Sequence, residues 1–113
     1  MKSKILALSK NEEFKKLLKN KKISNKYVTI FFGCLDNKNH KMLNISFVTK
    51  KKLGNAVKRN KIKRRLRNIM NDALKKIRIK LNYSYLVIAK PTMLNSEFKN
   101  IKETLFREFI KIK

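Results

Sequence analysis

The stretch that decides the fold runs from Arg59 to Arg67, and it reads Arg59-Asn60-Lys61-Ile62-Lys63-Arg64-Arg65-Leu66-Arg67. Ile62 and Leu66, followed by Ile69, recur at spacings of three and four, which is typical of the buried face of an α-helix. At about 100° per residue, four polar side chains share the arc beside this apolar one: Asn60, Lys63, Arg64 and Arg67. The sequence therefore predicts a helix that packs through one face and exposes a cationic one.

The apolar spacing continues through Ala73 and Ile77, so we expect one long helix from Ala56 to about Leu81, after the break at Gly54-Asn55. Arg59 falls near the apolar arc. Its aliphatic stem is expected to pack while its charged head reaches water.

Strands are predicted before this helix, at 27–35 and 42–49, because both segments are rich in β-branched and aromatic residues. With the turn residues 36–39 between them, they should form a hairpin. Residues 20–26 are mostly lysine and asparagine and are interpreted as a solvated connection. An extra short strand is possible near Lys50.

Helices are predicted toward both ends of the chain. Ser9 and Glu12 have capping-box spacing, and the helix that they start should end near Lys19. A strand at 83–89 stops at Lys90-Pro91, and a last helix begins near residue 95 or 96. That helix should bury one apolar stripe: Phe98, Ile101, Leu105, Phe109 and Ile112. The expected fold is an α/β domain spanning 1–113, an α+β sandwich of order α-β-β-(β)-α-β-α.

The charge of the chain indicates the class of its partner. Thirty-one Lys and Arg against 7 Asp and Glu give a net charge of +24 on 113 residues. Such a charge repels itself in the compact state, which favours a polyanionic partner, nucleic acid first. Four of the six arginines lie between Arg59 and Arg67. Guanidinium groups grip phosphate with a planar fork, so this cluster indicates a defined contact.

Several other functions are excluded by composition. Cys34 is the single cysteine, so no internal disulfide forms, and Cys34 with His40 cannot complete a zinc site of three or four ligands. The longest apolar run, Val28 to Leu35, is far shorter than the roughly 20 residues of a membrane span. The apolar segment after Met1 falls below the core of about 7 residues that a signal peptide needs. We therefore expect a cytoplasmic protein that neither binds a membrane nor acts on a small-molecule substrate.

A run of charged residues is ordinarily explained as a solvated helix face. Such a face usually carries both positive and negative side chains, whereas residues 50–67 contain no acid, so this explanation is not favoured here. Charge alone does not separate RNA from DNA.

The segment from Lys51 to Arg67 resembles the signature of the protein subunit of bacterial ribonuclease P. The family pattern, Arg-Asn-x-x-Lys-Arg-x-x-Arg, or RNR motif, is matched at every defined position, from Arg59 and Asn60 to Arg67. The element order, the strand ending in Lys90-Pro91 and the closing helix are also similar to the family.

This resemblance implies a three-layer sandwich in which the RNR helix lies in a left-handed βαβ crossover, against the general rule of right-handed crossovers. It implies a protein subunit that assists a catalytic RNA in removing the 5′ leader of precursor tRNA. The endoribonuclease active site and its Mg²⁺ are then expected in the RNA. The implied partners are the ribonuclease P catalytic RNA and precursor tRNA.

The resemblance also assigns site residues. Those implied to bind the catalytic RNA are Arg59, Asn60, Lys63, Arg64 and Arg67. Those implied to bind the leader, in a cleft between the first helix and the sheet, are Phe14, Leu18, Ile30, Lys51, Lys52 and Lys90. Leu18 stands where the family commonly has an aromatic residue, and Ile30 or a neighbour stands where it often has Tyr. Ser46 stands where Gly is usual and Lys90 where Arg is usual, and together these departures imply weaker base stacking in the cleft. From spacing alone, at least one of Phe14, Leu17 and Leu18 belongs to the core.

No residue of the chain is expected to be catalytic. Its carboxylates are scattered, and His40 is expected to be an exposed bystander in a turn, so neither a metal cluster nor an acid–base pair is predicted. Two other classes stay open from the residues: a structural RNA-binding protein of the ribosome, and a chromatin-type DNA-binding protein.

Overall fold

The computed structural model describes residues 5–8, 11–35 and 41–112. Its strands are β1 (Ile5–Leu6), β2 (Lys21–Ser24), β3 (Val28–Gly33), β4 (Leu43–Val48) and β5 (Ser84–Ala89). Its helices are α1 (Asn11–Leu18), α2 (Ala56–Lys76) and α3 (Phe98–Lys111), with 3-10 turns η1 (Lys51–Leu53) and η2 (Pro91–Leu94). The predicted α+β class and the long basic helix are confirmed. Among these residues, no helix is both long and apolar enough to cross a membrane. Ser9, the turn at 36–39 and His40 lie outside the described residues.

The five strands form one sheet in the order β1-β4-β5-β3-β2. β5 is central, pairing in parallel with β4 and antiparallel with β3. The predicted hairpin between the strands at 27–35 and 42–49 is therefore wrong, because β5 lies between β3 and β4. Nearly every residue of β5 is buried, and a strand buried on both faces and apolar throughout is best placed between two neighbours, where its backbone is fully paired.

The hairpin that does form joins β2 to β3, so the prediction of a solvated connection at 20–26 is also wrong. Asn25 closes the turn, because its side-chain oxygen accepts hydrogen bonds from the backbone N–H groups of Tyr27 (2.8 Å) and Val28 (2.9 Å). Lys21 and Lys22 are exposed on β2 at the sheet edge. Charged residues of this kind protect edge strands but weaken their apolar signal in the sequence.

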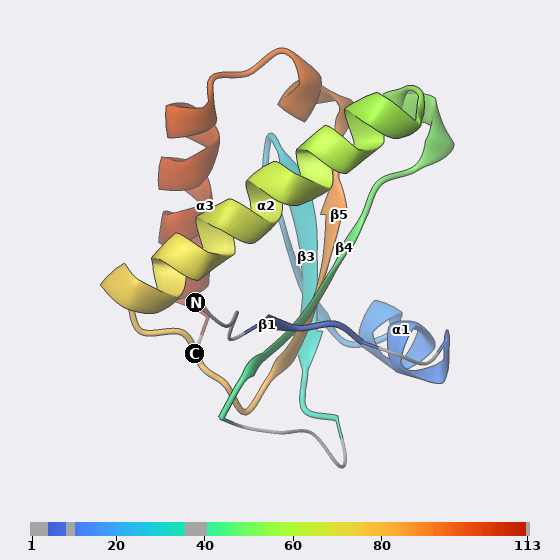
Figure 1. Cartoon of the computed structure of the whole chain (residues 1–113). Helices are drawn as coiled ribbons and strands as arrows, with labels where there is room; N and C mark the ends of the chain where they lie inside the picture. Colours follow the sequence, from blue (N-terminus) through green and yellow to red (C-terminus); the bar gives the residue numbers. More distant parts are fainter. Residues whose placement is uncertain (1–4, 9–10, 36–40, 113) are drawn as a thin grey trace.

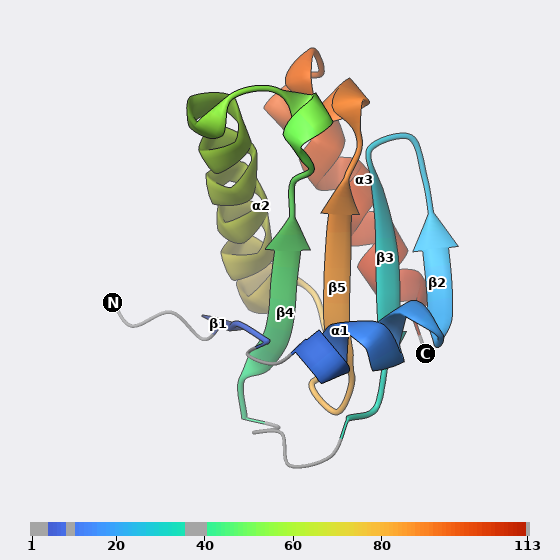
Figure 2. The same ribbon diagram turned by 90° about the vertical axis from the view of Figure 1, so that its right-hand side faces the viewer.

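Two helices cover one face of the sheet and one helix covers the other (Figures 1 and 2). Between the sheet and the helices α2 and α3 lies the main core, to which β3 and β5 contribute alternate residues: Val28, Ile30, Phe32, Tyr85, Val87 and Ala89. A smaller core of Leu8, Leu17 and Leu86 lies beneath α1. The fold is thus the three-layer sandwich that the resemblance implied.

The crossover from β4 through α2 to β5 is left-handed. In Figure 2, α2 lies behind the sheet and β5 stands to the right of β4, with both strands pointing up. A chain that rises along β4, passes backward, descends along α2 and returns into β5 traces a left-handed turn. The link into α2 contains Gly54, whose φ of 128° lies in a region that side chains other than glycine rarely adopt.

Three predicted boundaries need correction. α2 ends at Lys76 instead of about Leu81, because the backbone becomes extended at Ile77. The loop that follows is held by the Tyr85 hydroxyl, which donates to the Lys80 carbonyl at 2.6 Å; burial raises the pKa of Tyr85. α3 begins later than expected and leaves Phe98 38% exposed, outside the buried stripe. Near Lys50 the chain forms η1 instead of a strand.

Asn55→Ala tests the cap that starts α2. The Asn55 side-chain oxygen accepts a hydrogen bond of 3.0 Å from the backbone N–H of Lys58. Removing such a cap costs about 1 kcal/mol of stability, which corresponds to a fall of about 4 °C in melting temperature. Asn68→Ala, on the exposed side of the same helix, is the control and should not lower the melting temperature. Equal melting temperatures for Asn55→Ala and wild type would contradict the assignment.

Candidate RNA interface

The N-terminal half of α2 presents a cationic surface because its apolar arc is used by the core. Ile62, Leu66 and Ile69 are at most 2% exposed, so the residues between them must face outward. All four polar residues of the predicted arc are exposed: Asn60, Lys63, Arg64 and Arg67. Arg59 differs from them. It is half-buried, and its Nε is buried without a hydrogen-bond partner among the described residues.

The first carboxylate on α2 is that of Asp72, well beyond the basic segment. It accepts from Lys102 of α3 and lies 3.3 Å from the ammonium of Lys76. The hydrogen bond from Lys102, helped by the one from Lys76, holds the pKa of Asp72 below its ordinary value. This carboxylate therefore fastens α2 to α3, and the cations nearer the N-terminus of α2 form no ion pair with any residue that the structure describes.

The predicted leader cleft belongs to the opposite face of the sheet, where α1 crosses the lower part of the strands (Figure 2). Leu17 is fully buried under α1, Phe14 is half-buried and Leu18 is 48% exposed. The packing thus separates the three apolar residues of α1: Leu17 is the core residue, while Phe14 and Leu18 lie toward the open side.

The assignment of Ile30 to this cleft is wrong. Ile30 is 0% exposed and belongs to the main core on the α2 side of the sheet. Because side chains alternate along a strand, its neighbour Phe31 occupies the α1 side, where it packs half-buried against the smaller core. Phe31, and not Ile30, is therefore the residue of this pair that faces α1.

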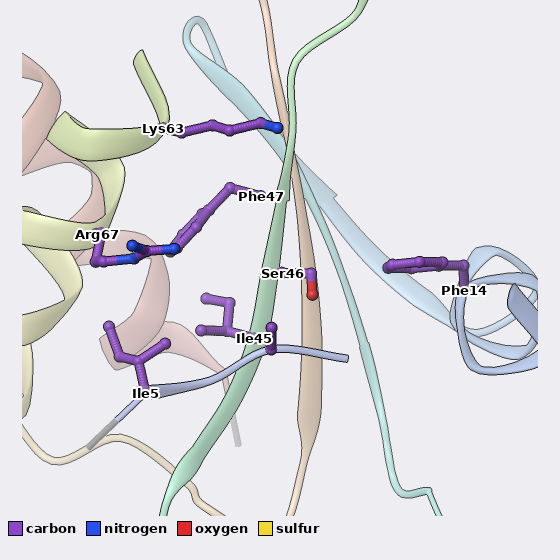
Figure 3. Close-up of a pocket in the computed structure, with 8 residues that line it drawn as sticks. Ile5, Phe14, Ile45, Ser46, Phe47, Lys63 and Arg67 are labelled. Atoms are coloured by element: carbon purple, nitrogen blue, oxygen red, sulfur yellow. The ribbon is translucent and has the colours of Figure 1, made fainter. Parts of the chain in front are cut away.

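A groove of about 460 Å³ connects the two surfaces at the outer edge of β4. Its lining comes from β1, the segment after it, α1, β4 and α2: Ile5, Ala7, Phe14, Ile45, Ser46, Phe47, Lys63 and Arg67. Figure 3 shows Lys63 and Arg67 reaching from α2 toward one side of β4, with Phe14 on the other side. The structure therefore brings residues of the two predicted binding sets to one groove.

The groove is open because β1 pairs only with Leu43 and Asn44 of β4. Farther along β4, the Leu8 backbone N–H donates a hydrogen bond of 2.8 Å to the Ser46 hydroxyl. An open strand edge presents backbone donors and acceptors. Phe47, half-buried in the groove, is not among the predicted site residues, because it shares one face of β4 with the core residues Leu43 and Ile45.

Lysines follow the ends of the two parallel strands. Lys51 and Lys52 are exposed in η1 after β4, and Lys90 follows β5. Since parallel neighbours end at the same edge of a sheet, these three residues lie at one end of it. Lys90 is partly engaged: its ammonium donates to the Ser24 hydroxyl at 2.8 Å and to the Asn25 carbonyl, which ties β5 to the β2–β3 turn.

Within the described ranges, no group of three or more His, Cys, Asp or Glu residues is placed to hold a metal ion. What the surface offers is cations, apolar side chains and an open strand edge.

The fold and the surface define a class of protein: a small α+β protein with a left-handed crossover, whose crossover helix has a cationic, acid-free N-terminal half beside a partly apolar groove. The sequence of this chain is similar to the sequences of known proteins. The family model described as "Ribonuclease P" matches residues 3–113. A protein named "Ribonuclease P protein component" from Bacillus pumilus is 35% identical over 105 residues, covering 92% of this chain and 85% of its own length. One of the same name from Carboxydothermus hydrogenoformans is 34% identical over 102 residues, covering 87% and 83%.

Solved structures agree with these matches. The RNase P protein of Staphylococcus aureus superimposes with a TM-score of 0.77 at 27% identity, covering 94% of this chain and 93% of that one. That of Thermotoga maritima gives a TM-score of 0.80 over 96% and 98% of the two chains; at 24% identity it supports the fold alone. The chain belongs to the family of bacterial ribonuclease P protein components.

Asp72→Asn tests the carboxylate that joins α2 to α3. Because the folded-state pKa of Asp72 is lowered, its stabilising effect is complete above the unfolded value of 3.8 and is lost as pH falls through the lower folded value. Wild type should therefore melt above the variant at neutral pH, and the difference should close below pH 3.8. Melting curves over a pH series measure this. A difference that persists unchanged at acid pH would show that the ion pair is not its cause.

Proposed function

We propose that this chain binds the catalytic RNA of ribonuclease P and the 5′ leader of precursor tRNA, and so assists endonucleolytic removal of the leader in the cytoplasm. One observation carries the proposal: a single groove at the edge of β4 brings two exposed cations of α2 together with two half-buried aromatic residues, Phe14 and Phe47. Phosphates and unstacked bases are the groups that such surfaces bind.

In this proposal the surface of α2 and the α1 side of the sheet bind different RNAs. The exposed residues of the RNR motif, together with Arg59, bind the catalytic RNA. Phe14, Leu18 and Phe31 contact the leader in the cleft, and Lys51, Lys52 and Lys90 bind its phosphates at the sheet end. Because Lys90 already donates to Ser24 and Asn25, it can offer one further N–H, so Lys51 and Lys52 carry more of this contact.

The chemistry in this proposal belongs to the RNA. Mg²⁺ held by the catalytic RNA supplies metal-assisted phosphodiester cleavage when bound. The protein lowers the repulsion between two polyanions and holds the leader near the cleavage site, which raises substrate affinity.

Reconstitution tests the proposal directly. Precursor tRNA with a labelled 5′ leader is cleaved by a bacterial ribonuclease P RNA at limiting Mg²⁺, with and without the purified protein. The proposal predicts faster release of the leader when the protein is present, at an unchanged cleavage position. The control is an equal concentration of an unrelated protein of similar charge. A cleavage rate that the two proteins raise equally would contradict the proposal.

Phe14→Ala tests the cleft. A base stacked on an aromatic ring contributes about 1 to 3 kcal/mol, so the holoenzyme should bind precursor tRNA at least about fivefold more weakly, while its affinity for mature tRNA stays unchanged. The matched control is Leu17→Ala, which empties a fully buried site. It should cost about 2 to 5 kcal/mol of stability and lower both affinities together. If Phe14→Ala behaves like Leu17→Ala, Phe14 is a core residue and not a leader contact.

A further inference from the structure

A second groove lies on the other flank of α2, away from β4 and the RNR residues Lys63 and Arg67. It runs between α2 and η2 and encloses about 460 Å³. Its lining comes from these two elements and the residue after them: Lys58, Lys61, Ile62, Arg65, Met93, Leu94 and Asn95. None of its cations belongs to the predicted RNR arc. At about 100° per residue they project from the opposite side of the helix.

The floor of this groove is apolar and firmly held. Ile62 is 2% and Met93 1% exposed, whereas Leu94 is 37% exposed at the opening. The Met93 backbone N–H donates to the Lys90 carbonyl at 3.0 Å, and the Thr92 hydroxyl donates to the Lys26 carbonyl. η2 is therefore fixed to the end of β5 and to the β2–β3 turn, so the groove is a built feature of the fold.

The rim is cationic and uncompensated. Lys58 and Lys61 are exposed and Arg65 is half-buried, and none of the three forms an ion pair within the described part of the chain. Asp72, the nearest acid in sequence to these cations, is paired with Lys76 and Lys102, and Glu97, two residues after Asn95, is exposed at the start of α3. Asn95 is exposed at the end of η2. Its backbone N–H donates to the Thr92 carbonyl.

These groups match the parts of one nucleotide. Ammonium groups bind phosphate, a guanidinium plane stacks on a base, and an amide pairs with a base edge. We propose that the groove between α2 and η2 binds one unstacked nucleotide of the catalytic RNA. Its base lies on Leu94 and Met93 against the Arg65 plane, its edge meets the Asn95 amide, and its phosphate lies between Lys58 and Lys61. The RNA would then contact α2 on two sides: at the RNR residues and at the groove beside η2.

An acidic protein segment is the other chemistry that three cations could attract. RNA is favoured because the whole N-terminal half of α2 lacks acids on both flanks, which suits one extended polyanion spanning the helix. The inference rests on the proposed function, since its ligand is the catalytic RNA.

Arg65→Lys tests the groove, because it keeps the charge and removes the planar group. Loss of one stacked base should weaken binding of a bacterial ribonuclease P RNA by at least about fivefold. Asn95→Ala should weaken it as well. The matched control, Arg78→Lys, makes the same change at an exposed site beyond the end of α2 and should bind like wild type. Melting temperatures are measured for all variants, and these exposed or half-buried substitutions should leave them unchanged.

Chemical probing of the RNA bases locates the contact. Wild type and Arg78→Lys should protect one unpaired base that Arg65→Lys and Asn95→Ala leave reactive. If both groove variants bind like wild type, or the pattern of protected bases is the same with all four proteins, the inference is overturned while the proposed function stands. If wild type neither binds the RNA nor stimulates leader cleavage, both are overturned.

Discussion

The packing of α2 against the sheet is the interaction on which the rest of the surface depends. Ile62, Leu66 and Ile69 are buried in the main core, and each such side chain contributes about 1.5 to 3 kcal/mol by leaving water. This burial fixes the rotation of the helix about its axis. Every cation between the apolar residues must then point outward, where a chain of net charge +24 needs an anionic partner.

The topology places this helix where its charge can be used. Because α2 connects β4 to the central strand β5 by a left-handed crossover, its basic half lies beside the outer edge of β4 (Figure 1). β1 is short and leaves that edge open. Lys63 and Arg67 of α2 and Phe14 of α1, which lie on opposite sides of the sheet, therefore meet at one groove. A right-handed crossover would place α2 on the other face, together with α1.

The sequence predicts those features that depend on local periodicity. The spacing of Ile62 and Leu66 predicts α2 and its exposed arc, and a helix core including Leu17 follows in the same way. The order of the strands depends instead on burial over long range: β5 separates β3 from β4, although β3 and β4 are consecutive in the chain. Ile30 shows the same limit. Alternation says that Ile30 and Phe31 face opposite sides, but only the packed structure decides which side is the cleft.

The most direct measurement is the salt dependence of the affinity between the protein and a bacterial ribonuclease P RNA. Each phosphate neutralised contributes about 0.7 to 0.9 to the fall of log affinity with log salt. We predict a steep slope for wild type, a slope shallower by about this amount for Arg64→Gln, and a wild-type slope for Arg78→Gln. A slope near zero, or equal changes in the two variants, would contradict the claim that packing of α2 creates a defined phosphate-binding surface.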